Sequence, residues 1–293
     1  MLGRASEFLG ERIQQPSLEF GCMDGLNTCV LLGGEFPFSY DVFEEARWDK
    51  ESHLRSTLQD DYYNATKDDI QVALLKTSTQ RLTVGVDWKQ AHFIKAERLK
   101  VFDRFSNWDP TKGMPDVESG SVSTIWAPNI YWMPEVAFVL KELRRVLRDD
   151  GRVVTIGPDL ALLRHMFFRF SQVAPQAWLN DLDRGRFQNA SQNARSLEDW
   201  GKLFSAQGFS ISRHDQFIPS LVGEVYDIGF RPMFAVLLNM REKIQSSSIE
   251  EMLALKREWV SSLSALSAPF CDETWMRKMG NPFLWHIFEL SPR

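Results

Sequence analysis

A short loop near the amino end of the chain has the residue types of a ligand-binding turn. Residues 17–27 read Ser-Leu-Glu-Phe-Gly-Cys-Met-Asp-Gly-Leu-Asn, an apolar strand followed by a glycine turn and the start of a helix. Glycine lacks a Cβ atom, so Gly21 and Gly25 allow positive φ and a close approach of a ligand to the backbone. Glu19 stands at the carboxyl end of the strand, where open α/β sheets bind ligands. A nucleotide-type site and an ordinary strand–helix turn both fit this loop.

A second acidic residue ends the next clear strand. Residues 82–87 read Leu-Thr-Val-Gly-Val-Asp, a β-branched and apolar run that ends in Asp87. A carboxylate at this place can accept both hydroxyls of a ribose. Helix capping is the alternative role, and we favour the ribose because strand and loop occur in the right order. A helix is expected over residues 91–99, with Phe93, Ile94, Ala96 and Leu99 as its apolar side chains.

Alternating strands and helices surround these two acids. Further strands are expected at 101–102, 122–126, 152–158, 208–212 and 284–290, and helices at 4–14, 134–147, 160–170, from 196 onward and within 232–267. This alternation indicates a largely parallel sheet with helices on both faces. The fold class is therefore α/β.

The chain is expected to form a single domain over residues 1–293. Residues 33–80 do not fit a compact strand–helix unit, and we interpret them as an insertion, either a lid over the site or a surface decoration. Residues 160–200 and 219–280 are expected to form a helical cap or substrate region. The segment 232–267 fits a cap or a dimer surface equally, so a homodimer stays open.

Composition excludes several classes of protein. The 34 Lys and Arg residues stand against 39 Asp and Glu residues, a net charge of −5, which argues against a chain-wide nucleic-acid surface. Cys22, Cys29 and Cys271 cannot all pair and lack metal-ligand spacing, so we expect no metal and a reducing compartment. The charged amino end does not resemble a signal peptide, and no apolar run is long enough for a membrane span. The sequence predicts a cytoplasmic protein.

One stretch carries a family resemblance. Residues 125–132 read Ile-Trp-Ala-Pro-Asn-Ile-Tyr-Trp, and residues 140–154 read LKELRRVLRDDGRVV, a helix, a turn and a strand. Together with the approach Trp108-Asp109-Pro110 and GMPDVESGSVSTIW, this stretch resembles the class I S-adenosylmethionine-dependent methyltransferases. The resemblance covers about residues 17–32, 82–158 and 196–218. It implies a doubly wound, mostly parallel seven-stranded sheet, with an insertion after the first glycine loop and a helical C-terminal cap.

The resemblance also implies roles for single residues toward the cofactor S-adenosylmethionine. Glu19 would take the place of the acid that ends the first strand. Gly21, Cys22 and Gly25 would form the loop under the methionine part. The residues expected at the ribose and adenine are Asp87 with Trp88 and Asp109 with Trp108, and those facing the methyl group are Ala127 and Pro128.

Methyl transfer to an oxygen also needs a base that removes a proton. His165, after the fifth strand, is the candidate base, while His92, His214 and His286 lie on predicted elements. Tyr131 and Trp132 are placed to line an acceptor pocket, with core packing as the alternative. Arg164 and Arg169 fit either an anionic substrate or a solvated helix face.

The resemblance reaches the substrate region weakly. Residues 226–232 read Tyr-Asp-Ile-Gly-Phe-Arg-Pro, similar to WDIGLRP in an accessory region of some bacterial methyltransferases, and residues 256–260 read Lys-Arg-Glu-Trp-Val. These enzymes act on sugars or secondary metabolites, which implies a small-molecule acceptor and a role in biosynthesis.

Two other functions stay open. Met23 replaces the middle glycine of the loop, and Val122 and Ser123 replace an aromatic residue and an acid, which fits a catalytically silent relative that acts as a binding subunit. A nicotinamide-dependent oxidoreductase is the third hypothesis, but the loop lacks the GxGxxG spacing. We expect an active S-adenosylmethionine-dependent methyltransferase.

Overall fold

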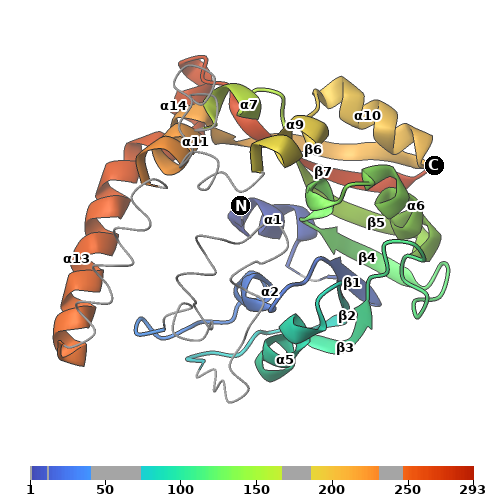
Figure 1. Ribbon diagram of the computed structural model, residues 1–293, viewed down its shortest axis with the longest axis horizontal. Coiled ribbons are helices and arrows are strands. Elements are labelled where there is room, and N and C mark those ends of the chain that lie inside the picture. Colours follow the sequence, from blue (N-terminus) through green and yellow to red (C-terminus); the bar gives the residue numbers. More distant parts are fainter. Residues whose placement is uncertain (1, 12, 41–73, 167–185, 231–246) are drawn as a thin grey trace.

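The fold is centred on one seven-stranded sheet (Figure 1). The computed structural model describes residues 2–11, 13–40, 74–166, 186–230 and 247–293. The strands run in the spatial order β3-β2-β1-β4-β5-β7-β6. Their bounds are β1 (Ser17–Phe20), β2 (Leu82–Asp87), β3 (Phe102–Asn107), β4 (Val122–Ala127), β5 (Leu147–Pro158), β6 (Phe209–Pro219) and β7 (Phe283–Pro292). Strands β1 to β5 pair in parallel, while β7 is antiparallel to both β5 and β6. The mostly parallel seven-stranded sheet is confirmed.

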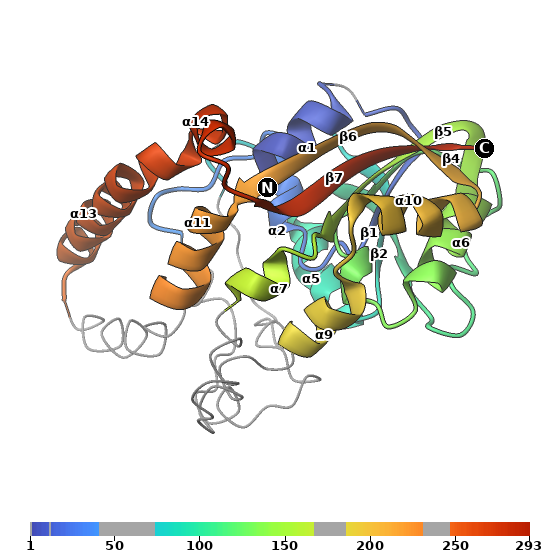
Figure 2. The same ribbon diagram turned by 90° about the horizontal axis from the view of Figure 1, so that it is seen from above.

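Helices cover both faces of the sheet, as the sequence predicts. The α-helices described are α1 (Leu2–Leu9), α2 (Leu26–Leu31), α5 (Gln90–Leu99), α6 (Val136–Val146), α7 (Leu162–His165), α9 (Arg186–Asn193), α10 (Leu197–Ala206), α11 (Ser220–Glu224), α13 (Ile249–Ser267) and α14 (Glu273–Lys278). Shorter turns are η2 (Ile130–Trp132), the π-helix η4 (Val225–Phe230) and η6 (Ala268–Cys271). One apolar cluster contains residues of α6 and α10, and a second contains residues of α1, α2 and α5. Figure 2 shows α1 and α10 on opposite sides of the sheet.

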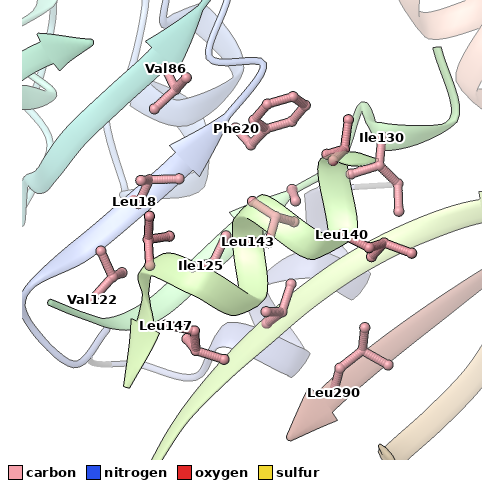
Figure 3. Packing of buried hydrophobic residues seen from close by; sticks show 14 of the residues in the cluster. Leu18, Phe20, Val86, Val122, Ile125, Ile130, Leu140, Leu143, Leu147 and Leu290 are labelled. Carbon is pink, nitrogen blue, oxygen red and sulfur yellow. The ribbon is translucent and has the colours of Figure 1, made fainter. Parts of the chain in front are cut away.

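The periodicity of α6 explains how the first face is closed. Val136, Val139, Leu140 and Leu143 recur at helical spacing and are all buried. Figure 3 shows Leu140 and Leu143 facing the strands. Burial of each leucine stabilises the fold by about 1.5–3 kcal/mol. This packing fixes β4 and β5, which lead into the site.

The first helix is shorter than the sequence predicts. The expected helix over 4–14 ends at Leu9, because Gly10 takes a φ of +77°. Arg152 on β5 donates from Nη1 to the Phe8 carbonyl at 3.1 Å and from Nη2 to the Leu9 carbonyl at 2.6 Å. These bonds satisfy carbonyls that a helix end leaves without partners and attach α1 to the sheet.

Several sequence predictions fall partly on residues outside the description. Residues 41–73 of the expected insertion, and residues 167–185 and 231–246 of the expected cap, are not described, so Arg169 is not placed. The division of the chain into domain, insertion and cap stays a prediction. Within the described residues, no helix combines the length and apolarity that a membrane crossing requires. The same part of the chain holds no group of three or more His, Cys, Asp or Glu able to bind a metal ion.

Candidate active site

Glu19 lies at the carboxyl end of β1, beside β2 and β4. Its register partners are Gly85 and Trp126, and its side chain is buried. Thr28 Oγ1 on α2 donates to Glu19 Oε2 at 2.5 Å. Burial raises the pKa of Glu19 to about 8, the Thr28 hydrogen bond opposes the rise, and the charge of Asp87 adds to it. Glu19 is therefore largely protonated at neutral pH.

The loop after β1 is held by its own backbone. The amides of Gly21 and Cys22 both donate to the Val86 carbonyl, at 2.8 and 3.0 Å, and Gly21 and Gly25 take φ values of +78° and +76°. A Cβ atom on Gly21 would lie 2.9 Å from Cβ of Asn129, so only glycine fits there. Asn129 Nδ2 donates to the Gly21 carbonyl at 2.8 Å, which joins the loops after β1 and β4. Strand order reverses between these strands, and open α/β sheets bind ligands at such a point.

Asp87 ends β2 next to this loop and receives hydrogen bonds from two backbone amides. The Met23 amide donates to Oδ2 and the Lys89 amide donates to Oδ1, both at 2.9 Å. His92 Nδ1 lies 3.3 Å from Oδ1, out of alignment for a hydrogen bond, and both ring nitrogens of this buried histidine lack a hydrogen-bond partner among the described residues. Met23 takes a φ of +48°, an uncommon value for a residue other than glycine. The loop is thus hydrogen-bonded to Asp87, the carboxylate expected at the ribose.

The residues expected at the adenine lie in contrasting environments. Trp88 is 54% exposed, with Lys89 Nζ 4.7 Å from its ring centre. Trp108 is buried, and its ring meets Phe20 edge-on at 4.9 Å, so its indole packs in the core. Asp109 Oδ1 accepts from the Thr111 amide and hydroxyl, and these bonds lower the pKa of Asp109. The adenine roles of these residues stay predictions.

Cys22 and Ala127 are buried beside the loop. The Cys22 thiol points toward β2, since a Cβ atom added to Gly85 would lie 3.1 Å from its Sγ. Burial raises the pKa of this thiol well above its ordinary value, and the charge of Glu19 adds to the rise. At the end of β4, the Ala127 carbonyl accepts from Thr155 Oγ1 at 2.7 Å. Cys22 can therefore contribute its backbone to a ligand, while its thiol stays in the core.

A histidine–carboxylate pair lies beyond the carboxyl ends of β5 and β6, at this edge of the sheet. His165 on α7 follows β5, Glu224 on α11 follows β6, and β5 and β6 run in the same direction because both oppose β7. His165 Nδ1 lies 2.7 Å from Glu224 Oε1. A carboxylate accepts, so Nδ1 carries a hydrogen, and the neutral tautomer with this hydrogen has its lone pair on Nε2. This pair has the arrangement of a general base and the carboxylate that orients it.

Tyr131 and Trp132 lie on η2, directly after β4. The Tyr131 ring meets the Trp285 ring at 4.9 Å, and Trp132 is 42% exposed. Asn189 Nδ2 on α9 donates to the Trp132 carbonyl at 3.4 Å, and α9 also contacts α7. The turn η2, which carries Tyr131 and Trp132, and the helix α7, which carries His165, thus both contact α9.

The other two histidines named above, the half-buried His214 and the buried His286, form a separate chain of contacts. His286 Nδ1 lies 2.9 Å from His214 Nε2, and His286 Nε2 lies 2.7 Å from Asp159 Oδ2. Burial lowers the pKa of His214, and the neighbouring His286 lowers it further. Both nitrogens of His286 face protein partners, so this pair is not available as a base for a substrate.

The residues at this edge fit S-adenosylmethionine better than a dinucleotide. The acids of the described loop and strand ends are Glu19, Asp24 and Asp87, and the buried Lys95 faces Asp24 Oδ2 at 3.2 Å. The Asp87 carboxylate suits ribose hydroxyls, and the loop lacks the glycine spacing of a turn that binds the pyrophosphate of a dinucleotide. These acidic residues are consistent with the predicted cofactor, S-adenosylmethionine.

Three residues of this arrangement were missed by sequence reasoning, namely Thr28, Asn129 and Glu224. Each of them forms its contact with a residue that lies on a different helix, strand or loop. Asn129 lies within the stretch that carries the resemblance, and Glu224 lies two residues before the accessory motif at 226–232. Their position near these motifs was the available signal.

Comparison with known proteins gives structural matches alone. No family model and no curated protein matches the chain. A methyltransferase from Geobacter sulfurreducens in complex with S-adenosylhomocysteine is 17% identical, with a TM-score of 0.44, over 100% of this chain and 90% of that one. A methyltransferase from Thiobacillus denitrificans, also with S-adenosylhomocysteine, is 11% identical, with a TM-score of 0.45, over 100% and 90%. Geranyl diphosphate C-methyltransferase from Streptomyces coelicolor is 13% identical, with a TM-score of 0.45, over 99% and 79%.

These identities and scores decide neither an activity nor a substrate, and the fold is assigned from the sheet itself. The sheet has the seven strands, mostly parallel, that the sequence resemblance implied, and the structure adds their order, with a central β1 flanked by β2 and β4 and an antiparallel β7 between β5 and β6. The described chain has the class I S-adenosylmethionine-dependent methyltransferase fold.

Proposed function

We propose that the chain transfers the methyl group of S-adenosylmethionine to a small molecule that loses a proton from oxygen or nitrogen. The observation that carries this proposal is the acidic edge formed by Glu19 and Asp87 at the ends of β1 and β2, in a sheet of this strand order. A fold hosts many functions, so the argument rests on these side chains rather than on the sheet alone. A sugar or a secondary metabolite is the expected acceptor class.

In this proposal the cofactor supplies an electrophilic methyl group bound to a sulfonium. Asp87 binds the ribose through the acceptor positions that the Met23 and Lys89 amides leave on its carboxylate. Glu19 and the loop from Gly21 to Gly25 lie beside the methionine part. Their role is to hold the reacting carbon in line with the acceptor, which lowers the entropic part of the barrier.

His165 is the proposed base. Its Nε2 takes the proton of the acceptor, while Glu224 accepts the Nδ1 hydrogen, fixes the tautomer and stabilises the imidazolium that forms. Tyr131 and Trp132 line the acceptor side in the proposal, and their aromatic faces exclude water around the developing bond.

A second candidate function is a catalytically silent binding subunit. The observation that favours it is the contact between the Met23 amide and Asp87 Oδ2, which occupies one acceptor position of the ribose carboxylate. In this alternative the loop stays closed over Asp87 and no cofactor enters.

Calorimetric titration with S-adenosylhomocysteine and S-adenosylmethionine separates the two functions. We expect binding by the unsubstituted protein, and roughly tenfold weaker binding by Asp87→Asn, because a hydrogen bond to a charged group contributes about 1.5–3 kcal/mol. Asp103→Asn is the matched control, since Asp103 is an exposed acid whose Oδ1 lies 4.0 Å from Nη1 of Arg81, the residue before β2. Its affinity should stay within about twofold of the unsubstituted value.

A positive titration leads to an acceptor screen. Pools of sugars, phenols and amines are incubated with S-adenosylmethionine, and release of S-adenosylhomocysteine is measured. Absence of cofactor binding by the unsubstituted protein would overturn the methyltransferase proposal and favour the binding subunit.

A further inference from the structure

A lysine is buried directly behind the cofactor loop. Lys95 on α5 is 1% exposed, and its Nζ lies 3.2 Å from Asp24 Oδ2 and donates to the Tyr40 hydroxyl at 2.7 Å. The same nitrogen lies 5.5 Å from the centre of the Tyr40 ring. Burying a cation is costly unless partners compensate it, so the position of this charge is fixed by Asp24 and Tyr40.

Asp24 transmits this position to the loop. It stands between Met23 and Gly25, and its Oδ1 accepts from the Leu26 amide at 3.2 Å, at the first residue of α2. Lys95 therefore binds one oxygen of Asp24 while the other holds the start of the helix. The next residue back, Met23, is the one whose amide reaches Asp87. Lys95, which is 1% exposed, is thus joined to the loop through Asp24.

Tyr40 connects the same lysine to a distant helix. Residues 33–40 leave α2 and run toward α13 in both views (Figures 1 and 2). There Lys256 Nζ donates to the Phe38 carbonyl and, at 2.9 Å, to the Tyr40 carbonyl. Lys256 Nζ also lies 4.8 Å from the centre of the Phe38 ring. One cation on α13 thus holds the backbone of Tyr40, and the Tyr40 side chain holds Lys95.

We propose that Lys95 is a positioning residue for the cofactor loop, and that Lys256 on α13 acts on the loop through Tyr40 and Lys95. This inference rests on the proposed function, since it assigns a role in binding S-adenosylmethionine. The contacts form one continuous path from Lys256 through Tyr40 and Lys95 to Asp24. Because α13 belongs to the region expected to contact the acceptor, the path couples the acceptor side to the affinity for the cofactor.

The test is a double-mutant cycle on the affinity for S-adenosylhomocysteine. We expect Lys95→Met to raise Kd roughly tenfold and Lys256→Met to raise it roughly threefold, within the usual range of coupling between sites. The double variant should resemble Lys95→Met, because the proposed path from Lys256 to the loop passes through Lys95. Titrations are made well below the melting temperature of each variant, so a loss of stability alone does not move Kd.

Two further variants complete the design. Lys76→Met is the matched control, because Lys76 forms an exposed ion pair at 3.1 Å with Glu35, in the same 33–40 segment. It should leave Kd unchanged. If Lys95→Met does not fold, Tyr40→Phe carries the test, since it removes only the hydroxyl that Lys95 binds.

The outcomes separate this inference from the proposed function. An unsubstituted protein that binds, with folded Lys95→Met or Tyr40→Phe variants of unchanged Kd, would overturn the positioning role and leave the methyltransferase proposal intact. Independent effects in the double variant, near thirtyfold by multiplication of the two estimates, would overturn the path from Lys256. No binding by the unsubstituted protein would overturn both proposals.

Discussion

His165 and Glu224 stand 59 residues apart in the chain, and their side chains meet with Nδ1 2.7 Å from Oε1. The meeting follows from the sheet. β5 and β6 run in the same direction, so the residues after their carboxyl ends emerge at one edge. The short helices α7 and α11 are thereby brought together at the edge of the sheet where Asp87 lies.

The first prediction concerns this pair. With an acceptor identified by the screen, His165→Asn should lower kcat by about 100- to 10,000-fold, because the positioned base is lost. Glu224→Gln should lower kcat less, on the order of tenfold, because the imidazole remains but loses the carboxylate that stabilises its cation. Steady-state kinetics measure both, and the affinity for S-adenosylhomocysteine should stay within about twofold.

His214→Gln is the control for that prediction. His214 is bonded to His286 inside the sheet, so its replacement should lower the melting temperature and leave kcat unchanged. A His165→Asn variant that retains full kcat would show that the acceptor is deprotonated by another group or needs no base.

The second prediction concerns the buried acid Glu19. Its pKa in the folded protein is raised to about 8, above the value of about 4.3 for an unfolded chain. Between these values the folded state holds a proton that the unfolded state has lost, so the stability it contributes is complete below about pH 4 and is lost as pH rises through about 8.

Glu19→Gln removes this pH dependence. The free energy of unfolding, measured by urea denaturation at pH 5.5, 7.0 and 8.5, should change in favour of the glutamine variant as pH rises. The difference between the two proteins is expected to grow by about 1.4 kcal/mol per pH unit over the range where one proton separates the states. A constant difference at all three values would mean that Glu19 is ionised in the folded protein.

The third prediction compares two glycines on facing elements. A Cβ atom on Gly157 of β5 would lie 2.4 Å from Cζ2 of Trp200, whereas on Gly201 of α10 it would find only Ile211 Cδ1, at 3.9 Å. Gly157→Ala should destabilise the fold by about 1–3 kcal/mol through overpacking. Gly201→Ala should stabilise it by about 0.5–1 kcal/mol, because alanine favours the helix. Denaturation midpoints measure both, and equal midpoints would contradict the packing of Trp200 on β5.

The fourth prediction tests the hydrogen bond between the two loops of the site. Asn129→Ala removes the bond from Nδ2 to the Gly21 carbonyl and should cost about 1 kcal/mol of stability. It should also weaken binding of S-adenosylhomocysteine, because Gly21 lies in the cofactor loop. Ser119→Ala, on an exposed turn, is the control. An unchanged Kd for Asn129→Ala would separate the bond from cofactor binding.

The sheet could be predicted from the sequence because each of its strands carries a local signal. Alternation of apolar strands and amphipathic helices indicated the fold class, and Asp87 was expected as the last residue of its strand, as the structure has it. The helix α5 shows where local pattern fails. Its expected apolar residue Ile94 is 37% exposed, while Lys95 and His92 are buried. For Lys95 the tertiary partner Asp24 explains the burial, which the hydrophobicity of the side chain would not predict.

The roles of the candidate site residues stay predictions, and the sequence could not tell which way each side chain points. The sequence pattern around a residue that follows a strand is the same whether its side chain points into solvent or into the core. Trp88 is exposed, and Trp108, which was expected beside the adenine, packs on Phe20. Glu224 and Asn129 could not be assigned roles, since each works through a partner distant in the chain. Such pairs become visible only when the fold is known.

The position of β7 near the end of the sequence determines when the sheet can be completed during synthesis. In the described sheet, β6 pairs with β7 alone, and β7 follows β6 by the whole stretch that contains α11, α13 and α14. During synthesis, β6 must wait without a hydrogen-bonded neighbour until residues 283–292 leave the ribosome. The edge of β5 that later pairs with β7 has unpaired backbone groups for the same interval, and such an edge can pair with strands of other chains. Closure of the sheet is therefore a late event, and a nascent chain stalled before β7 is the form most exposed to aggregation.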